Sequence, residues 1–244
     1  MYNHKKYKGQ KKISLDLPVV LLCGGKGERL NPLTSLDPKP LIPINGTPIL
    51  TYLISYLELF GFKKFIVAAG YKSHKIFEYF ETHHKNLEIE IIDSGDVDIV
   101  ERIKGASEFI QGDFIVCYGD TLADVDLHKM INYHHSHDGA LTLTSYPLLS
   151  SFGILDIQKN GKVVSFMEKP VLDKWINIGY FYFSQECKCD LKDCISFVDF
   201  IQERIARDEL YSYNHRGIHI TVNTITELRE AEKNIASFNR ILNR

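Results

Sequence analysis

Hydrophobic residues in the first half of the chain fall into short apolar runs separated by stretches with helical spacing. The runs cover residues 19–23, 64–69 and 114–118, and apolar runs of this length are typical of parallel strands that are buried on both faces. Between the first two runs, the apolar residues of 49–57 recur every three or four positions, which predicts a helix. This order predicts a βαβ unit.

The same alternation of helices and strands continues as far as residue 118. Ser73 can cap a helix whose apolar residues extend to Phe80. Residues 87–93 alternate between apolar and polar positions, which predicts a strand, and the spacing over 99–110 predicts a further helix. Residues that follow the run 114–118 should lie at the sheet edge where open α/β sheets bind ligands.

The second half of the chain has a different pattern of hydrophobic and polar residues. From residue 140 onward, short runs rich in β-forming residues are separated by turn signals such as Asn160-Gly161, which predicts mixed or antiparallel strands. Helical spacing returns over 197–206 and 225–241, with a strand-like segment at 215–222 between them. We therefore expect an α/β fold, a Rossmann-like domain with a mostly parallel central sheet and a smaller mixed or antiparallel lobe.

The domain organisation is predicted from the length of the chain and from the lack of any dividing segment. A chain of 244 residues can bury a substantial core, and we find no linker, internal repeat or low-complexity stretch that would divide it. We expect a basic extension over 1–17 and one domain over 18–244. Within that domain, residues 18–138 and 139–244 should form two halves.

Composition excludes some classes of partner. Lysine and arginine number 29 against 31 acidic residues, so the net charge of −2 indicates neither nucleic acid nor a membrane surface as a partner. The basic start of the chain lacks the apolar run of a signal peptide, and no segment has eighteen uninterrupted apolar residues. We therefore expect a cytoplasmic protein.

Cysteine and histidine give weaker signals. The five cysteines are an odd number, and their spacing contains no CxxC pair, which argues against a structural zinc site. Cys23 and Cys117 fall in apolar runs, where a reduced thiol packs as a small hydrophobe. The histidines at 83–84 and 134–137 fall in segments that look like polar helix ends, so we expect them to be solvated. No HExxH spacing is present.

The most specific chemistry follows the first apolar run. Gly24, Gly25 and Gly27 lack Cβ atoms, so backbone N–H groups there can approach phosphate oxygens. The loop matches neither a Walker loop nor a dinucleotide-binding turn. Three cations in and after it can supply countercharge for a triphosphate: Lys26, Arg29 and Lys39.

A carboxylate follows the third apolar run. Gly119-Asp120 begins where the run ends, and most aspartates in such positions only cap or turn the chain. Here the run lies downstream of a phosphate-binding loop, at the expected ligand-binding edge of the sheet. Asp120 is therefore a candidate to hold Mg²⁺ on the α-phosphate of a nucleotide.

Several longer motifs carry a resemblance to a known family. The pattern GGxGxRLxPLT followed by PKPLxPIxGxPIL resembles the signature of sugar-phosphate nucleotidyltransferases. The stretches ERIK, YGDTLADV, FGIL, MEKP and WINIGYF are most similar to glucose-1-phosphate cytidylyltransferases. The likeness covers about residues 19–183 and continues more weakly to 232.

The resemblance implies roles for individual residues. It implies catalytic roles for Arg29, Lys39, Asp120 and Lys169. It implies nucleotide binding by Cys23, Gly24, Gly25, Lys26, Gly27, Arg29, Lys39, Arg102, Gly119 and Asp120. It implies substrate binding by Gly153, Glu168, Lys169, Trp175, Asn177 and Gly179, and metal binding by Asp120 and Thr221. It also implies a homo-oligomer, and it implies that 18–138 is the nucleotide-binding half of the domain and 139–244 the sugar-phosphate-binding half.

Four features depart from the family pattern. Glu28 adds a negative charge to the phosphate loop, and Val100-Glu101 replaces a glycine pair before Arg102. Ile178 replaces a small residue in the WINxG motif. Thr221 is placed where the second metal-binding aspartate is expected, so Mg²⁺ would rest on Asp120, the nucleotide and water.

We therefore expect an enzyme in which the phosphate of a sugar 1-phosphate, similar to glucose 1-phosphate, attacks the α-phosphorus of CTP and releases pyrophosphate. Such chemistry depends on alignment and charge neutralisation, and the nucleophile needs no general base. Another nucleotide (GTP, UTP or dTTP) or another phosphate acceptor is the first alternative. A nucleotide-binding regulatory paralogue with weakened catalysis is the second. A dinucleotide-dependent oxidoreductase fits less well, because the glycine spacing differs.

Overall fold

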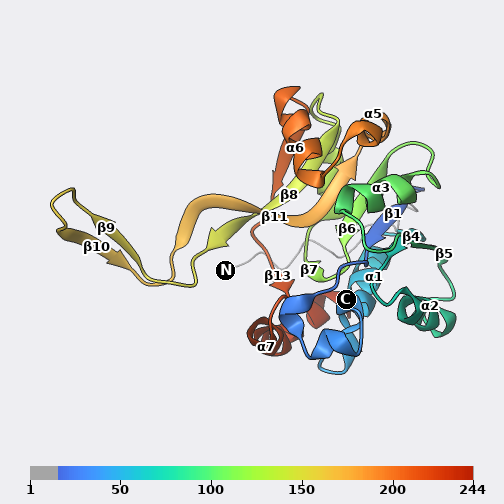
Figure 1. Cartoon of the computed structure of the whole chain (residues 1–244), viewed down its shortest axis with the longest axis horizontal. Coiled ribbons are helices and arrows are strands. Elements are labelled where there is room, and N and C mark those ends of the chain that lie inside the picture. The colour runs from blue at the N-terminus through green and yellow to red at the C-terminus, as the bar shows by residue number, and fades with distance from the viewer. Residues whose placement is uncertain (1–15, 244) are drawn as a thin grey trace.

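The computed structural model describes residues 16–243 and has a seven-stranded sheet at its centre (Figure 1). The strand order is β12-β8-β11-β6-β1-β4-β5. The strands of this sheet are β1 (Val19–Leu22), β4 (Lys64–Ala69), β5 (Glu88–Asp93), β6 (Phe114–Tyr118), β8 (Leu141–Leu149), β11 (Val171–Phe183) and β12 (Leu210–Asn214). The expected extension over 1–17 falls almost wholly outside the described residues.

The first half of the chain forms the parallel part of the sheet. Strand β1 lies between β4 and β6 and runs parallel to both, and β4 is parallel to β5. The carboxyl ends of β1 and β6 therefore meet at one edge of the sheet, because Leu22 is in register with Tyr118. The loop after β1 and Asp120 after β6 are consequently neighbours, as the sequence predicted.

Helices cover both faces of this sheet. Successive residues of β1 point to opposite faces: Val19 joins the cluster packed by α1 and α7, whereas Val20 joins the cluster packed by α3 and α6. The helices are α1 (Ile49–Leu59), α2 (Ser73–Thr82), α3 (Ile99–Ser107), α4 (Leu127–His134), α5 (Gln185–Asp190), α6 (Phe197–Ala206) and α7 (Ile225–Leu242). No helix among these residues is long and apolar enough to cross a membrane.

Short elements connect this frame. The 3₁₀ helices are η1 (Glu28–Leu30), η2 (Leu33–Ser35), η3 (Lys39–Leu41) and η4 (Leu191–Asp193), and the short strands are β2 (Pro43–Ile44), β3 (Thr47–Pro48), β7 (Thr121–Ala123) and β13 (His219–Thr221). The antiparallel pair β7–β13 brings Thr221 opposite Thr121. This pairing carries the chain after β12 back to the edge of the sheet where Asp120 lies.

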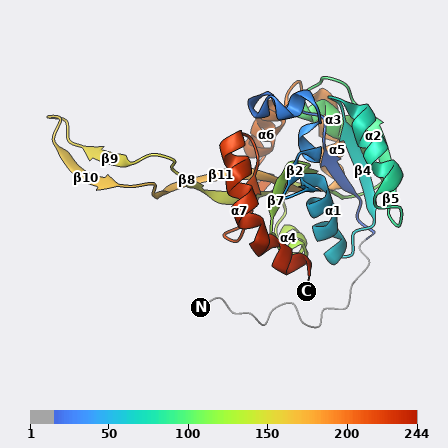
Figure 2. The same cartoon turned by 90° about the horizontal axis from the view of Figure 1, so that it is seen from below.

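The second half of the chain is mixed, as expected. Strand β11 is antiparallel to β6 and β8, and β12 is parallel to β8. Strands β8 and β11 continue beyond the body into a hairpin of β9 (Ile154–Ile157) and β10 (Val163–Met167), which we call the arm (residues 149–171). Figures 1 and 2 both show the arm projecting away from the helices and the central sheet. The predicted fold class is therefore confirmed.

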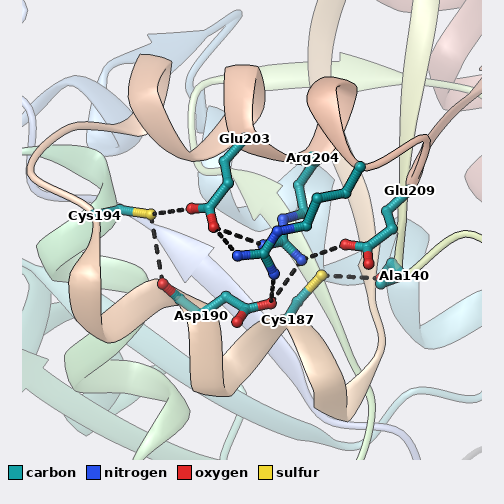
Figure 3. A network of polar contacts seen from close by, with 8 residues as sticks. Ala140, Cys187, Asp190, Cys194, Glu203, Arg204 and Glu209 are labelled. Carbon is teal, nitrogen blue, oxygen red and sulfur yellow. Dashed lines mark hydrogen bonds and ion pairs between the residues drawn. The ribbon is translucent and has the colours of Figure 1, made fainter.

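A buried ionic network ties α5 and α6 to the sheet (Figure 3). The guanidinium of Arg204 lies 2.6 Å from the carboxylate of Asp190 and 2.5 Å from that of Glu209. The Cys187 thiol donates a hydrogen bond to the Ala140 carbonyl, and the Cys194 thiol to the Asp190 carbonyl. Among the described residues no group of three or more Cys, His, Asp and Glu side chains is arranged to hold a metal.

The expectation that the second histidine group is solvated is wrong for His134. This side chain is buried, stacks on Tyr182 with ring centroids 3.9 Å apart, and shares a 2.8 Å hydrogen bond with Thr142. Burial lowers the pKa of His134 to about 4. Although the sequence around this helix end is polar, His134 packs in the interior.

Candidate active site

The glycine-rich loop is shaped by what lies behind it. A Cβ atom on Gly24 would stand 1.5 Å from an Arg102 guanidinium nitrogen, so a larger residue cannot fit there without moving that side chain. Gly27 adopts a left-handed φ of 62° at the start of η1. Its carbonyl accepts a hydrogen bond from the Thr34 hydroxyl, which fixes the turn. Gly24 thus allows the Arg102 side chain to approach the loop closely, and Gly27 allows the chain to turn.

Arg102 supports this loop from beneath. Its guanidinium donates to the carbonyls of Ala69 (3.3 Å) and Val97 (3.0 Å). Burial lowers the pKa of Arg102, and the nearby carboxylate of Asp96 partly offsets this effect. The residue also lines a cavity beside the loop, so it can support the loop and face a ligand at once.

A compact polar cluster lies at the end of β6. The Lys39 ammonium donates to the Asp120 carboxylate and, at 2.8 Å, to the side-chain oxygen of Asn223. Arg29 reaches the same oxygen at 3.4 Å, and the Asn223 amide donates to the Thr221 hydroxyl at 2.9 Å. Segments from three parts of the chain therefore converge on one point.

Asn223 is a site residue that the sequence interpretation missed. Its backbone N–H donates to Glu227 at 2.7 Å, and Thr224 caps α7. The T-x-x-E capping signal at 224–227 fixes the start of α7 and hence the direction in which Asn223 faces. That signal begins three residues beyond Thr221 and directly after Asn223, so it could have drawn attention to Asn223.

These groups border a cavity of about 610 Å³. Its walls are Gly25, Lys26, Gly27, Glu28, Arg29, Lys39, Tyr118, Asp120, Thr121, Ile176, Asn177, Ile178, His219, Thr221 and Asn223. The volume suits a small ligand. Cations of the loop side face neutral side chains of β11 and β13 across the cavity. Glu28 is exposed at its rim.

The wall formed by β11 is held by hydrogen bonds. The Asn177 side chain donates to the Tyr118 hydroxyl at 3.3 Å and accepts from the Gly179 N–H at 2.9 Å. Burial raises the pKa of Tyr118 to about 12, so its phenol stays protonated at neutral pH. Gly179 has a φ of 77°, and a Cβ there would lie 2.3 Å from the Tyr118 ring.

A second cavity of about 410 Å³ adjoins the first. The two share the loop and the end of β6, because Gly25, Lys26, Tyr118 and Asp120 line both. At the mouth of the second cavity, the Lys26 ammonium lies 2.5 Å from the Asp96 carboxylate. This hydrogen bond and the positive charge lower the pKa of Asp96. A ligand with two parts could therefore extend from one cavity into the other.

Two departures from the family pattern point away from these cavities. Val100 is fully buried in the core beneath α3, and Glu101 forms a 2.7 Å ion pair with Lys104 on the same helix. Ile178 is different, because it is buried and still borders the first cavity. Its side chain occupies space in the cavity wall at a position where a small residue was expected.

Not all of the predicted site residues converge. Gly153, Glu168 and Lys169 belong to the arm and do not border either cavity. Cys23 is buried behind the loop, where burial raises its pKa far above the ordinary thiol range. Trp175 is half exposed, with the Arg216 guanidinium 4.8 Å from its ring centroid.

Oxygen donors suitable for a magnesium ion do meet at the polar cluster. Asp120 offers a carboxylate, while Thr221 and Asn223 offer a neutral hydroxyl and amide oxygen nearby. Mg²⁺ prefers oxygen ligands and commonly binds through one or two carboxylates together with substrate phosphates and water. The residues present therefore fit a magnesium ion that a bound nucleotide helps to hold.

Comparison with known proteins agrees with this geometry. The profile of the nucleotidyl transferase family matches residues 18–243. The glucose-1-phosphate cytidylyltransferase of Salmonella typhi is 37% identical over 68% of the chain and 74% of its own length. The probable glucose-1-phosphate cytidylyltransferase of Bacillus subtilis (strain 168) is 34% identical over 89% of the chain and 95% of its own length.

A solved structure agrees as well. HddC from Yersinia pseudotuberculosis, complexed with GMP-PN, is 25% identical, covers 90% of this chain and 99% of its own, and superposes with a TM-score of 0.70. The match to the family profile spans nearly the whole chain and includes both the loop and the polar cluster. The chain belongs to the nucleotidyl transferase family.

Proposed function

We propose that this enzyme transfers a cytidylyl group from CTP to a sugar 1-phosphate, with glucose 1-phosphate the first candidate, and releases pyrophosphate. The observation that carries the proposal is the Lys39–Asp120–Asn223 cluster at the meeting point of two cavities. The relatives named as glucose-1-phosphate cytidylyltransferases support CTP and the sugar.

The cations have distinct roles in this proposal. The N–H groups of the Gly24 to Gly27 loop and the Arg29 side chain hold the β- and γ-phosphates. Lys39 neutralises the charge that develops on the α-phosphate, and Asp120 holds Lys39 in place. The base enters the second cavity beside Lys26 and Asp96. The sugar lies against Asn177, whose side chain is held by the Gly179 N–H.

Magnesium would be held by Asp120, with Thr221 and Asn223 contributing neutral oxygens, and would supply positive charge to the nucleotide phosphates. The acceptor phosphate is already ionised at neutral pH, so the chain need not provide a base. Its own residues bind, orient and neutralise charge. This division is consistent with a cavity whose charged groups are Lys26, Glu28, Arg29, Lys39 and Asp120.

The test is pyrophosphate release by the purified chain with Mg²⁺, glucose 1-phosphate and each of CTP, UTP, GTP, ATP and dTTP. We expect release with CTP. Preference for another nucleotide would correct the base and keep the reaction; HddC complexed with GMP-PN makes GTP the first alternative. Tight CTP binding without release, with glucose 1-phosphate or other sugar phosphates, would instead support a regulatory paralogue.

A further inference from the structure

The second cavity has one charged pair at its mouth. Lys26 and Asp96 both line this cavity, and the Lys26 ammonium lies 2.5 Å from Oδ2 of Asp96. The other carboxylate oxygen of Asp96, Oδ1, has no hydrogen-bond donor among the described residues. The ammonium has three N–H donors, and within the same part of the chain it uses one of them. Both side chains therefore keep hydrogen-bonding capacity for a ligand.

The other two carboxylates that line this cavity are committed elsewhere. Oδ1 of Asp98 accepts from the N–H of Val100 at 2.9 Å, in the first turn of α3. The same oxygen accepts from the N–H of Phe197 at 3.0 Å, at the start of α6. Asp120 belongs to the polar cluster at the end of β6. Asp96 is therefore the carboxylate that is left to contact a base.

The loop that carries Asp96 is held on both sides of this residue. On one side, the Ser94 N–H donates to the Ala69 carbonyl at 3.0 Å, at the end of β4. On the other side, the Val97 carbonyl accepts from the Arg102 guanidinium at 3.0 Å, and Arg102 is 5% exposed. Because the neighbouring backbone is fixed, Asp96 has a defined position at the mouth of the cavity although its side chain is exposed.

The charge of the pair suits a neutral ligand group. One ammonium and one carboxylate have no net charge together. The hydrogen bond from Lys26 lowers the pKa of Asp96, so the carboxylate stays ionised at neutral pH. A phosphate group would be repelled by this carboxylate. The pair is therefore better suited to hydrogen-bond a nucleobase than to hold a phosphate.

Nucleobases differ in the order of their donors and acceptors. Cytosine has an N4 amine donor beside an N3 acceptor, whereas uracil and thymine have an O4 acceptor beside an N3–H donor. A carboxylate only accepts hydrogen bonds, and an ammonium only donates them. Asp96 and Lys26 together therefore match the donor and acceptor of cytosine and oppose those of uracil and thymine.

We propose that Asp96 and Lys26 determine the base specificity, with the Asp96 carboxylate accepting from the cytosine N4 amine and the Lys26 ammonium donating to N3. The inference rests on the proposed function, because it deepens the assignment of the second cavity to the base. UTP and dTTP are rejected, since each places an oxygen against Asp96 and an N–H against Lys26. The pair does not by itself exclude ATP, because adenine also has an amine beside a ring acceptor.

The test is the ratio of kcat/KM for CTP to that for UTP, measured with Mg²⁺ and glucose 1-phosphate. Asp96→Asn keeps the shape of the side chain and replaces one acceptor oxygen with an amide donor, which can bond O4 of uracil. We expect the ratio to fall about tenfold, as for the loss of one good hydrogen-bonded contact to a base. An unchanged ratio in Asp96→Asn, or a wild type that prefers UTP or dTTP, overturns the proposal.

Glu101→Gln is the matched control. It removes one carboxylate from α3, where Glu101 pairs with Lys104 and borders neither cavity. This variant should keep the wild-type ratio of CTP to UTP. If Glu101→Gln lowers the ratio as much as Asp96→Asn does, general negative charge causes the preference and the proposed contact is wrong.

Exchange of the two charges tests the order of the contacts. The double variant Lys26→Glu with Asp96→Lys presents a carboxylate to N3–H of uracil and an ammonium to O4. CTP and UTP carry the same triphosphate, so any loss of phosphate binding lowers kcat/KM for both and cancels in their ratio. We expect the preference to shift from CTP toward UTP. A double variant that keeps the wild-type ratio contradicts the proposal.

Binding separates this inference from the proposed function. Calorimetry measures Kd for CTP and for UTP with Mg²⁺ and without an acceptor. If no sugar phosphate gives turnover, but the wild type binds CTP more tightly than UTP and Asp96→Asn removes the difference, the inference stands and the proposed function fails. If CTP and glucose 1-phosphate give turnover while Asp96→Asn discriminates as the wild type does, the proposed function stands and the inference is wrong.

Discussion

Two charged clusters in this protein are built in different ways. Around Arg204, three carboxylates from α5, α6 and the following turn enclose a guanidinium whose side chain is 1% exposed. Around Lys39, a carboxylate and an amide oxygen come from segments far apart in sequence and border a 610 Å³ cavity. The first cluster neutralises its cation within the fold, although the buried Nε and Nη2 atoms of Arg204 have no hydrogen-bond partner among the described residues. The second directs its cations toward space that a ligand can fill.

An ion pair alone therefore does not mark a functional site. What distinguishes the Lys39 cluster is its access to a cavity and its position beyond the ends of parallel strands. Breaking the Arg204 cluster should therefore cost stability, whereas breaking the Lys39 cluster should cost catalysis.

Lys39→Met should reduce kcat/KM for cytidylyl transfer by about 10²–10³-fold, because a preorganised donor to the transition state is worth about 3–4 kcal/mol. Pyrophosphate release measures the loss. Methionine keeps much of the buried aliphatic volume, so the thermal midpoint should stay near that of the wild type. Lys129→Met, on the exposed side of α4, is the matched control, and wild-type kinetics for Lys39→Met would contradict the assignment.

Arg204→Met should have the opposite profile. Its removal leaves Asp190, Glu203 and Glu209 close together without their shared cation, and breaking such a pair costs about 3 kcal/mol at the low end of measured values, appropriate here because the carboxylates are partly exposed. Urea unfolding measures the change. The folded fraction should retain wild-type KM for CTP, and a selective loss of catalysis at unchanged stability would refute the comparison.

Acid should destabilise the fold through His134. Its folded pKa of about 4 is below the value of 6.5 for an unperturbed histidine, so the unfolded chain binds more protons between these pH values. Stability from this residue is present above pH 6.5 and is lost as pH falls toward 4. The loss should be about 1.6 kcal/mol between pH 6.5 and 5, because the unfolded side chain is already half protonated at pH 6.5.

Urea titrations at several pH values measure this slope. His134→Gln keeps a polar partner for Thr142 and cannot titrate, so its stability should vary less over the same interval. His74→Gln, a change at an exposed position on α2, is the control. Equal slopes for His134→Gln and the wild type would remove His134 as the cause.

Asn223→Asp should have the smallest effect, on metal affinity. It places a second carboxylate beside Asp120 in contact with Lys39, and added negative charge favours a bound divalent cation. Calorimetry with Mg²⁺ and CTP should show about tenfold tighter metal binding, or about 1.4 kcal/mol. Thr221→Asp, two residues earlier, is the comparison. Weaker Mg²⁺ binding by Asn223→Asp would show that its oxygen serves only to hold Lys39.

Much of the fold could be predicted because local patterns and tertiary structure agree. The apolar run at 19–23 became the buried strand β1, and the spacing over 49–57 became α1. Strand order fixed the neighbourhood of the loop and Asp120, since both follow parallel strands that are in register. Nucleotidyl transferase membership was predicted from ordered motifs and is confirmed.

The remaining features depend on long-range packing that a sequence pattern does not contain. Arg102 is buried beneath Gly24 because α3 packs on β1 and β4, which spacing within α3 does not reveal. Asn223 reaches Lys39 only because β13 pairs with β7. The sequence of the arm predicts ordinary strands. No local pattern in it indicates that these strands project away from the central sheet. The role of Lys169, which lies in this arm and borders neither cavity, therefore stays a prediction.

The most direct test of the account follows the α-phosphate of the nucleotide. Purified enzyme is incubated with Mg²⁺, glucose 1-phosphate and CTP labelled at the α-phosphate, and the products are separated by anion exchange. The proposed reaction predicts that the label moves into a CDP-sugar in amounts equal to the pyrophosphate released, and that Lys39→Met slows both equally. Label that remains in CTP, or appears only in CMP, would contradict it.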